Sequence, residues 1–382
     1  MTALRKVSVV FGNALMAPEL FKGIGHFLSE GAPWIVRSHD FPTNWGEQLR
    51  GSGADGFLVY AYEPDIVQEL QALGVPVVNV STRLQGSLPT VTLDNRALGT
   101  MAAEHLLSLG VYWFGFLGRN FSFSRERFSG FRDRLFAEPD FRKDRLFDAR
   151  PFMDTRSENE KVIERTRAWM RSLPKPIAIF TEDDELAQLV SNVARESGWE
   201  VPGDVAVLGC NNRERVCFLG HPPLSSIDPN GRGIGHAAAR LLERMMQGES
   251  IPGTYREEIF PHGVVQRQST DVIAVPDPCV AQAVRWIREN HAGRISVEDV
   301  VRQVPLSRCL LERSFRQYLG HTPLWEIKRT RVEKVCELLV NTNMGMEEIS
   351  AESGFQSPQR MARVFKDILK QTPTEYRRKT RR

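Results

Sequence analysis

The sequence predicts an α/β domain of two subdomains, followed by an all-α domain that contains two helix-turn-helix motifs. Three observations predict this arrangement. Short apolar runs alternate with amphipathic runs up to about residue 270. The last hundred or so residues show helical periodicity only, and two stretches in them match each other. We therefore expect a first domain over residues 1–270, a linker over 271–279 and a second domain over 280–382.

The first domain is predicted to form parallel sheets with helices on both faces. Its strand-like runs are VSVVF, GFLVY, VPVVNV, FGFLG, IAIFT and VAVLG. They are separated by helix-like runs such as ELFKGIGHFLSE, AEHLLSLG, KVIERTRAWMRSL and ELAQLVSNVARESG. Parallel strands need crossovers of this kind. The length of this region favours two subdomains with a cleft between them, and a ligand at the carboxyl ends of the strands.

The second domain contains a sequence repeat with an offset of 50 residues. Ser307 matches Ser357, and Phe315 matches Phe365. A repeat of this kind implies one supersecondary motif that is used twice. The two serines are predicted N-caps, because their hydroxyl groups can accept a hydrogen bond from the first turn of a helix.

Each copy of the repeat has the pattern of a helix-turn-helix motif. A short amphipathic helix is predicted over residues 297–304 and again over residues 346–353. The first ends at Pro305 and the second at Gly354. A glycine at this place favours the positive φ with which many helices end. Both motifs therefore have a short first helix, a turn and a capped second helix.

The second helix of each motif has one apolar face and one polar face. Leu311 and Phe315, or Met361 and Phe365, lie on the apolar face and are predicted core residues. The opposite face carries cations and amides, which read base edges in the major groove. The residues that we expect to contact DNA are Arg308, Glu312, Arg313, Ser357, Gln359, Arg360 and Arg363.

The spacing and charge of the second domain predict how it meets DNA. A helix over residues 324–341 joins the two motifs and would be about 27 Å long. It would hold the two second helices at a distance that suits successive major grooves, about 34 Å apart. Residues 279–382 carry 20 Lys/Arg against 12 Asp/Glu, and the remainder carries 30 against 35. We therefore expect double-stranded DNA to bind the second domain through two adjacent major grooves.

The second domain also resembles a known family. SRCLLERSFRQYLGHTP and EEISAESGFQSPQRMARVFKDILKQTPTEYRR resemble the AraC/XylS family of bacterial regulators over about 100 residues. This resemblance implies a sequence-specific transcription regulator. It places the base-reading positions on Cys309, Glu312, Arg313, Pro358, Gln359, Arg360 and Arg363. Cys309 and Pro358 are poor hydrogen-bonding readers. Arg313 and Arg363 have an alternative role in contacts with phosphate or acidic neighbours.

The first domain resembles a second family. VTLDNRALGTMAAEHLLSLG, RFSGFRDRL, PIAIFTEDDELAQLV and VPGDVAVLGCNNRERVCFLGHPPLSSIDPN resemble the LacI/GalR ligand-binding module over most of residues 5–265. That module has the type I periplasmic-binding-protein fold. In chain order, the two domains are similar to bacterial xylose regulators. The resemblance implies a small sugar effector, a pentose such as xylose, and we expect a homodimer.

The second resemblance assigns ligand contacts to matching positions. Arg127 in RFSGF matches an arginine that holds sugar hydroxyls. Asp183 matches a position that is often Asn, and Asn211 one that is usually Asp, so acid and amide are exchanged here. Asn79 matches an occasional Asp, and residues after the first strand would form an apolar wall. The expected ligand contacts are Arg127, Asp183, Asn211, Asn79, Leu15 and Met16.

Some of these residues have alternative structural roles. Asn211 is also typical of a turn at a strand end, and Arg127 of a salt bridge on a helix face. The acidic run 183–185 follows the strand IAIFT. It fits the N-terminal turn of a helix, a set of ligand contacts or a metal cluster.

Several classes of protein are disfavoured. The chain has no GxGxxG, P-loop or GxSxG motif, so we expect neither an enzyme nor a cofactor. Its eight histidines lack ligand spacing and its five cysteines form no CxxC pair, so we expect no metal. The apolar run 7–11 is too short for a signal peptide, and no stretch approaches the roughly 18 apolar residues of a membrane span. We therefore expect a cytoplasmic protein.

Two hypotheses about function remain, with an enzyme as a weaker third. In the first, a sugar controls a DNA-binding regulator through the first domain. In the second, the second domain still binds DNA, but the first domain is a dimerisation module or senses a ligand that is not a sugar.

Overall fold

A computed structural model describes residues 4–12, 14–39, 49–82, 86–139, 141–150, 160–271, 277–293, 295–369 and 371–380. The chain divides into two compact units. The first, here called the α/β unit, comprises residues 1–105 and 113–270. The second, here called the helical unit, comprises residues 106–112 and 271–382. Much of the predicted linker, including Pro276, lies outside the described residues.

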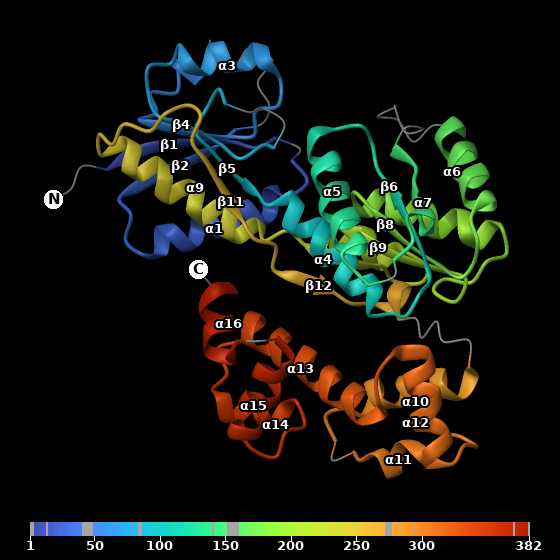
Figure 1. Cartoon of the computed structure of the whole chain (residues 1–382). Helices are drawn as coiled ribbons and strands as arrows, with labels where there is room; N and C mark the ends of the chain where they lie inside the picture. Colours follow the sequence, from blue (N-terminus) through green and yellow to red (C-terminus); the bar gives the residue numbers. More distant parts are fainter. Residues whose placement is uncertain are drawn as a thin grey trace. The chain divides into compact units, whose positions relative to one another are not determined.

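The α/β unit contains two six-stranded sheets in the part of the chain that the structure describes (Figure 1). In order across the sheet, the first comprises β11 (Arg256–Ile259), β5 (Thr90–Leu93), β4 (Val77–Asn79), β3 (Gly56–Val59), β1 (Arg5–Val10) and β2 (Trp34–Ser38). The second comprises β12 (Gly263–Val265), β10 (Ser225–Asp228), β9 (Val205–Cys210), β8 (Ile177–Thr181), β6 (Trp113–Leu117) and β7 (Leu146–Asp148). We call each sheet with its helices a lobe.

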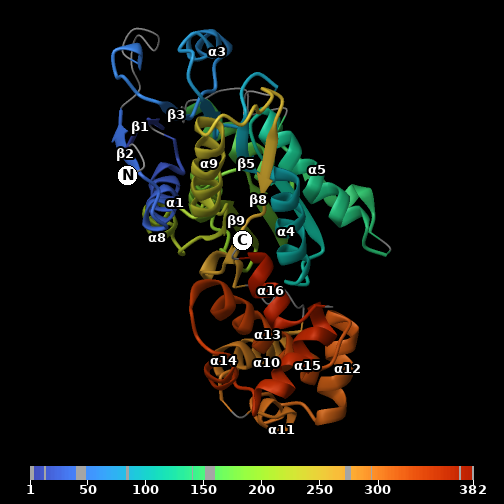
Figure 2. The ribbon, with the colours of Figure 1, turned by 90° about the vertical axis from the view of Figure 1, so that its left-hand side faces the viewer.

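Helices cover both sheets. Those of the α/β unit are α1 (Ala17–Ser29), α3 (Pro64–Gln71), α4 (Asn95–Leu107), α5 (Ser122–Phe136), α6 (Glu160–Ser172), α7 (Asp184–Glu196), α8 (Glu214–Leu219) and α9 (Gly231–Met246), with short 3₁₀ turns η1 (Lys143–Arg145) and η3 (Gln268–Thr270). In the first lobe α9 packs on α1 and on β3, β4 and β5, and α1 and α9 lie side by side in both views (Figures 1 and 2). In the second lobe α7 packs on α6, β8 and β9.

The predicted alternation of strands and helices is confirmed, with one exception to the parallel pairing. All six predicted strands and all four quoted helices are present. Their apolar side chains form the cores, with Phe57 and Val59 buried in the first lobe and Ile179 and Val207 in the second. The pairing of β10 with β12 is antiparallel. The chain enters β12 from β11 of the first lobe, and only a few residues separate Ile259 from Gly263. This connection is too short for the crossover helix that parallel pairing requires.

The chain passes between the lobes three times within the described residues. It leaves β5 of the first sheet and enters α4 and β6 of the second lobe. It returns from β10 to α9, and then runs from β11 to β12. The two lobes are therefore formed by segments that are far apart in the sequence.

The helical unit consists of helices in its described part. They are α10 (Pro278–Asn290), α11 (Val297–Val301), α12 (Arg308–Leu319), α13 (Pro323–Asn341), α14 (Met346–Glu352), α15 (Pro358–Leu369) and α16 (Pro373–Thr380). The first motif is α11 with α12, and the second is α14 with α15. Both motifs pack against α13, which contributes Ile327 to the first core and Val335 to the second.

The local signals of the two motifs are confirmed. Leu311, Phe315, Met361 and Phe365 are almost completely buried. The hydroxyl of Ser307 accepts a hydrogen bond from the N–H of Leu310, as an N-cap does. The first helix of each motif is shorter than predicted and ends at Val301 or Glu352. No helix in the described part of the chain is long and apolar enough to cross a membrane.

Candidate ligand cavity and DNA-binding surface

A cavity in the α/β unit encloses about 530 Å³ of empty space, part of it open to solvent. Apolar and polar side chains line it together. They are Leu15, Met16, Tyr60, Val80, Thr82, Leu93, Phe123, Arg127, Glu182, Asp183 and Asn211. Five of the six ligand contacts predicted from the sequence are thus brought together in one cavity.

Most cavity residues come from the carboxyl ends of strands in both lobes. Met16 follows β1 and Tyr60 follows β3 in the first lobe. Asp183 follows β8 and Asn211 follows β9 in the second. The carboxyl ends of parallel strands meet at one edge of a sheet, which is where ligands bind in folds of this class. The topology therefore explains why residues nearly 200 positions apart share a cavity.

Arg127 on α5 is held rigidly at the cavity. Its side chain is buried, and its Nε donates to Oδ1 of Asn95 at 2.9 Å. Its Nη1 donates to the backbone carbonyl of Glu182, and its guanidinium lies 5.1 Å from the centre of the Phe123 ring. Among the described residues these bonds use two of the five N–H donors, so the others can donate into the cavity.

Asp183 and Glu182 form a charged group with Arg119 beside the cavity. Nη1 of Arg119 lies 2.6 Å from Oε1 of Glu182 and 2.6 Å from Oδ2 of Asp183. The backbone N–H of Arg119 donates to Oε2 of Glu182 at 2.7 Å. Burial and the neighbouring Asp183 carboxylate raise the pKa of Glu182. Burial alone would lower the pKa of Arg119, but the two carboxylates raise it above its usual value.

The acidic run 183–185 begins α7. The Asp183 carboxylate accepts from the N–H of Leu186 at 2.8 Å and caps the helix. Glu185 forms an ion pair with Arg213. Within the described residues, none of the three acids belongs to a group whose ligand atoms lie close enough to share a metal ion. Helix capping therefore explains this run, and Asp183 combines it with a place in the cavity lining.

Asp184 positions the turn that carries Asn211. Its two carboxylate oxygens accept from the N–H of Arg213 at 2.7 Å and from the hydroxyl of Ser226 at 2.5 Å. Burial raises its pKa to about 7. Asn211 and Asn212 both have positive φ, a conformation that asparagine tolerates better than most residues. Asn211 is thus a strand-end turn residue and also part of the cavity lining.

Asn79 is the predicted ligand contact that the structure does not bring into the cavity lining. It is fully buried and does not belong to the cavity lining. Its Oδ1 accepts from the backbone N–H of Ala61 at 3.0 Å and of Ser81 at 3.1 Å. These bonds tie the end of β4 to the end of β3. The side chain therefore satisfies backbone groups of the sheet edge.

Sequence reasoning missed several cavity residues. Glu182 stands directly before the acidic run 183–185 and belongs to the lining of the same cavity. Tyr60 is the last residue of the predicted strand GFLVY and directly follows the observed strand β3, and Phe123 lies one turn before Arg127 on α5. Positions directly after buried strands would have identified Glu182 and Tyr60. Phe123 offers no such signal, because α5 only weakly separates apolar from polar residues.

In the first motif, some of the side chains that we expect to contact DNA form ion pairs within the protein. Arg308 is exposed, and its Nε donates to Oε1 of Glu312 at 3.0 Å. Its Nη1 also pairs with Glu298 of α11. Arg313 is exposed and forms no ion pair or hydrogen bond with a described residue. Of the two predicted cations of this helix, Arg308 and Arg313, Arg313 is therefore the one that is free to meet DNA.

In the second motif, the corresponding side chains carry fewer internal bonds. Gln359, Arg360 and Arg363 are exposed on α15. Arg360 donates to Oε1 of Gln356 at 2.6 Å. The partly buried Ser357 accepts from the N–H of Arg360 at 3.3 Å and caps the helix. Arg363, like Arg313, has no ion pair or hydrogen bond within the described part of the chain.

Contacts across α13 fix the two motifs relative to each other. Arg331 of α13 donates from Nε to the carbonyl of His291 at 3.0 Å and from Nη2 to that of Gly293 at 2.8 Å. Gly354, in the turn of the second motif, has φ +75° and packs against the same segment. A Cβ there would lie 2.4 Å from the carbonyl oxygen of His291. The two recognition helices, α12 and α15, are therefore carried on one rigid support.

These features define a class of protein. A two-lobed α/β unit with a polar cavity at its strand ends is the form of a small-molecule sensor. Two helix-turn-helix motifs with exposed cations on their second helices form a DNA-binding domain. A chain with both is a ligand-responsive transcription regulator.

Comparison with known proteins finds a matching family for each of the two domains. Residues 103–270 match the periplasmic binding protein-like domain, and residues 300–379 match the helix-turn-helix domain. The chain is 31% identical to the xylose operon regulatory protein of Escherichia coli K12, over 98% of this chain and 97% of that protein. It is 27% identical to the protein of the same name from Haemophilus influenzae, over 97% and 98%. A solved structure described as the xylose-binding transcription activator xylR matches with a TM-score of 0.62 and 29% identity, over 99% of this chain and 98% of that one.

The chain belongs to the family of the xylose operon regulatory proteins, AraC-type transcription regulators with a periplasmic-binding-protein-like sensor. The fold class and the family predicted from the sequence are thereby confirmed. The relatives are transcription regulators, in agreement with the expectation of a regulator rather than an enzyme.

Proposed function

We propose that a pentose, of which xylose is the first candidate, binds the cavity and controls how the helical unit engages DNA. The observation that carries this proposal is the cavity lining, in which Arg127, Asp183 and Asn211 converge from separate elements beside an apolar wall. The names of the relatives support the choice of xylose. The protein would act on DNA in the cytoplasm and carry out no catalysis.

The polar residues of the cavity suit the hydroxyl groups of a sugar. A sugar hydroxyl both donates and accepts, so it needs partners of both kinds. Arg127 supplies donors only, the Asp183 carboxylate supplies acceptors only, and Asn211 supplies both. Leu15, Met16 and Phe123 would cover the less polar face of the ring. The exchanged acid and amide keep one carboxylate in the cavity while changing which hydroxyl it holds.

Ligand binding would couple to DNA through a change in the arrangement of the lobes. The cavity is lined by both lobes, so a bound sugar would favour the arrangement in which both contact it. A ligand shifts an equilibrium only by its difference in affinity for the two states. In a homodimer, this change would alter how two helical units engage their sites, each reading two adjacent major grooves.

A calorimetric titration of the full-length protein with a panel of sugars tests the proposal. The panel contains xylose, arabinose, ribose, glucose and their phosphates. We expect saturable binding of one free pentose and a rise in thermal midpoint that grows with its concentration. Arg127→Lys should abolish that response, because an ammonium cannot reproduce the fixed fork of donors.

The matched control is Arg125→Lys, since Arg125 lies on the same helix and its guanidinium bonds only to Asn120 among the described residues. It should bind the sugar as the unmodified protein does. If no member of the panel binds, the α/β unit is better explained as a dimerisation module or as a sensor of another ligand. Analytical ultracentrifugation with and without sugar tests the dimer.

A further inference from the structure

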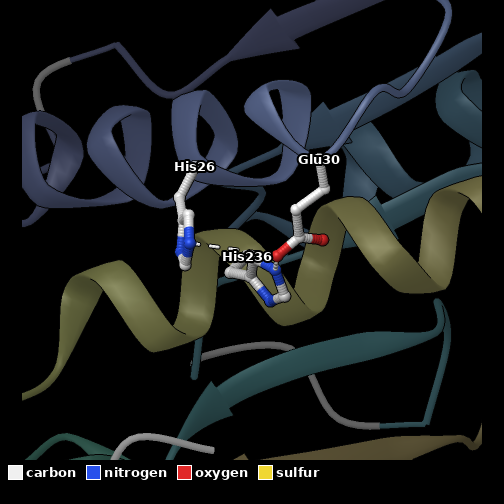
Figure 3. A group of neighbouring side chains, drawn as sticks. All are labelled: His26, Glu30 and His236. Atoms are coloured by element: carbon white, nitrogen blue, oxygen red, sulfur yellow. Dashed lines mark hydrogen bonds and ion pairs between the residues drawn. The ribbon is translucent and has the colours of Figure 1, made fainter.

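We propose that His26 of α1, Glu30 at the C-cap of α1 and His236 of α9 form a binding site for a divalent transition metal ion, with Zn²⁺ as the best match. Figure 3 shows His26 and Glu30 projecting from α1 toward His236 on the neighbouring helix. This site lies outside the sugar cavity, shares no residue with it and does not depend on the proposed sugar. It also departs from our expectation of no metal, which rested on spacing along the sequence.

The ligand atoms are already close together. Nε2 of His236 lies 3.0 Å from Oε1 of Glu30, and Nε2 of His26 lies 3.9 Å from the same oxygen. One ligand atom from each of the three residues lies within 4.8 Å of the others. In a tetrahedral zinc site with bonds of about 2.0–2.1 Å, ligand atoms are about 3.3 Å apart. Small rotations of the side chains, of which His26 is the most exposed, would bring them to that spacing.

The backbone beneath the site holds the two helices in fixed register. Gly23 and Gly235 lie at the point where α1 and α9 cross. A Cβ on Gly23 would lie 2.1 Å from the carbonyl oxygen of Arg232, and one on Gly235 would lie 2.1 Å from that of Leu20. The helices therefore touch through their backbones. His26 lies one turn after Gly23, and His236 directly follows Gly235, so the crossing determines the separation of the two imidazoles.

The side chains are further organised by their own positions. His26 and Glu30 are four residues apart and therefore occupy the same face of α1. The ring of His236 packs edge-on against Phe27, with 5.9 Å between the ring centres, and lies 5.2 Å from the ring of His26. The Phe27 contact limits the rotation of His236. Three ligands are thus presented from two helices that cannot slide past each other.

The donor set decides the class of metal. Two imidazole nitrogens and one carboxylate suit Zn²⁺ and other late first-row ions, whereas Mg²⁺ and Ca²⁺ prefer oxygen ligands. Three protein ligands leave a fourth tetrahedral position. Because the group is at the protein surface, water or a donor from another molecule can take that position. The site would join α1 and α9 of the first lobe and stabilise it.

The first test measures metal binding by the full-length protein. The protein is treated with a chelator, dialysed and titrated with Zn²⁺ by calorimetry, and with Co²⁺ by visible absorption. We expect one Zn²⁺ per chain at this site, a Co²⁺ spectrum typical of four-coordinate nitrogen and oxygen ligation, and a higher thermal midpoint with metal. Failure of the unmodified protein to bind either ion overturns the proposal.

Variants then assign the binding to these residues. Replacement of an outer-shell partner commonly weakens metal binding 10–100-fold, so loss of a direct ligand in His26→Gln or His236→Gln should weaken it about 100-fold or more. The control is His262→Gln. The side chain of His262 is 28% exposed against 27% for His236, and it too lies near a carboxylate, that of Asp228 at 4.0 Å. The control should bind Zn²⁺ as the unmodified protein does.

Circular dichroism of each metal-free variant shows whether it is folded. If folded His26→Gln and His236→Gln proteins take up Zn²⁺ with unchanged affinity, the metal binds elsewhere and the proposal is wrong. Since none of these variants touches the cavity, the sugar titration gives a separate result. Loss of metal binding with intact sugar binding, or the reverse, would distinguish the two proposals.

Discussion

The two helix-turn-helix motifs have the same fold but use their charges differently. In the first, Arg308 is paired with Glu312 and Glu298. A buried ion pair on α13, between Glu326 and Arg329, lies next to the core of this motif. In the second, Arg360 bonds to a neutral side chain, Gln356, and Arg363 has no ion pair or hydrogen bond to any described residue, as Arg313 has none in the first. In the core of the second motif, the ring of Tyr376 packs against that of Phe365, with 5.6 Å between the ring centres.

This difference separates cations that support the fold from cations that are free to bind. Arg308 would have to exchange two carboxylates for a phosphate or a base, whereas Arg363 would give up only water. The repeat in the sequence makes the two motifs look equivalent. We infer that the second motif supplies more of the base-specific contacts, and the following predictions test that inference from the largest expected effect to the smallest.

The largest effect is expected from Glu326→Ala, which should destabilise the first motif selectively. Glu326 is 2% exposed and accepts two hydrogen bonds from Arg329, at 2.7 and 3.0 Å. Loss of Glu326 leaves two donors of the buried Arg329 without a partner, although Arg329 keeps its ion pair with Glu333, and we expect a cost of about 3 kcal/mol. Hydrogen exchange of the full-length protein should show faster exchange in α11 and α12 than before. Equal acceleration in α14 and α15 would show that the motifs unfold together.

The same pair predicts a loss of stability in acid. Burial acts to raise the pKa of Glu326, but the bonds from Arg329 outweigh it and lower the pKa below the usual 4.5. The stabilisation is therefore present above pH 4.5 and is lost as the pH falls through the lowered pKa. The difference in thermal midpoint between the unmodified protein and Glu326→Ala should shrink between pH 7 and pH 3. A constant difference would contradict an ionised Glu326.

For DNA binding, Arg363→Ala should cost more than Arg308→Ala. We expect a loss of about 1–3 kcal/mol for Arg363→Ala, concentrated at one base position. Arg308→Ala should cost less than about 1 kcal/mol, because its surface ion pairs compete with DNA. Fluorescence anisotropy with a set of single-base variants of the operator measures both. A loss at Arg363 that is equal on all sequences would identify a phosphate contact instead.

The smallest effect is expected from Glu298→Gln, which should strengthen DNA binding slightly. The change removes a negative charge beside Arg308, an expected DNA contact, and releases one bond of that arginine. One more phosphate contact would steepen the salt dependence of the affinity by about one unit on logarithmic axes. Anisotropy titrations between low and moderate salt measure the slope. An unchanged slope would show that Arg308 stays bound to Glu312.

Local signals explain why the helical unit could be predicted closely. Caps such as Ser307, breakers such as Gly354 and the apolar spacing of Phe315 and Phe365 act within a few residues of themselves. The charge pairing of Arg308 could not be predicted as readily, because Glu298 lies on another helix. Its position depends on the angle of the turn, which the sequence pattern does not specify.

In the α/β unit, strands were easier to predict than side-chain partners. Buried strands such as IAIFT can be recognised from their continuous apolar residues. The residues that follow them lie at the carboxyl edge of the sheet, where ligands bind. Asn79 satisfies this rule of position but turns toward the backbone of Ala61 and Ser81. The group of His26, Glu30 and His236 was missed because 206 residues separate Glu30 from His236. Only the crossing of two helices brings them together.

The three passages of the chain between the lobes have a mechanical consequence. Two bodies joined by a single chain segment can move in many directions, whereas three connecting segments restrict their relative movement. The last passage ends in the second lobe, where Ser269 donates to the carbonyl of Val207 at 2.6 Å and Thr270 to the hydroxyl of Ser225 at 2.7 Å. The covalent route to the DNA-binding helices therefore starts from the second lobe alone. Along the chain, any movement of the first lobe that the proposed ligand causes would have to pass through the second lobe before it reaches the DNA-binding helices.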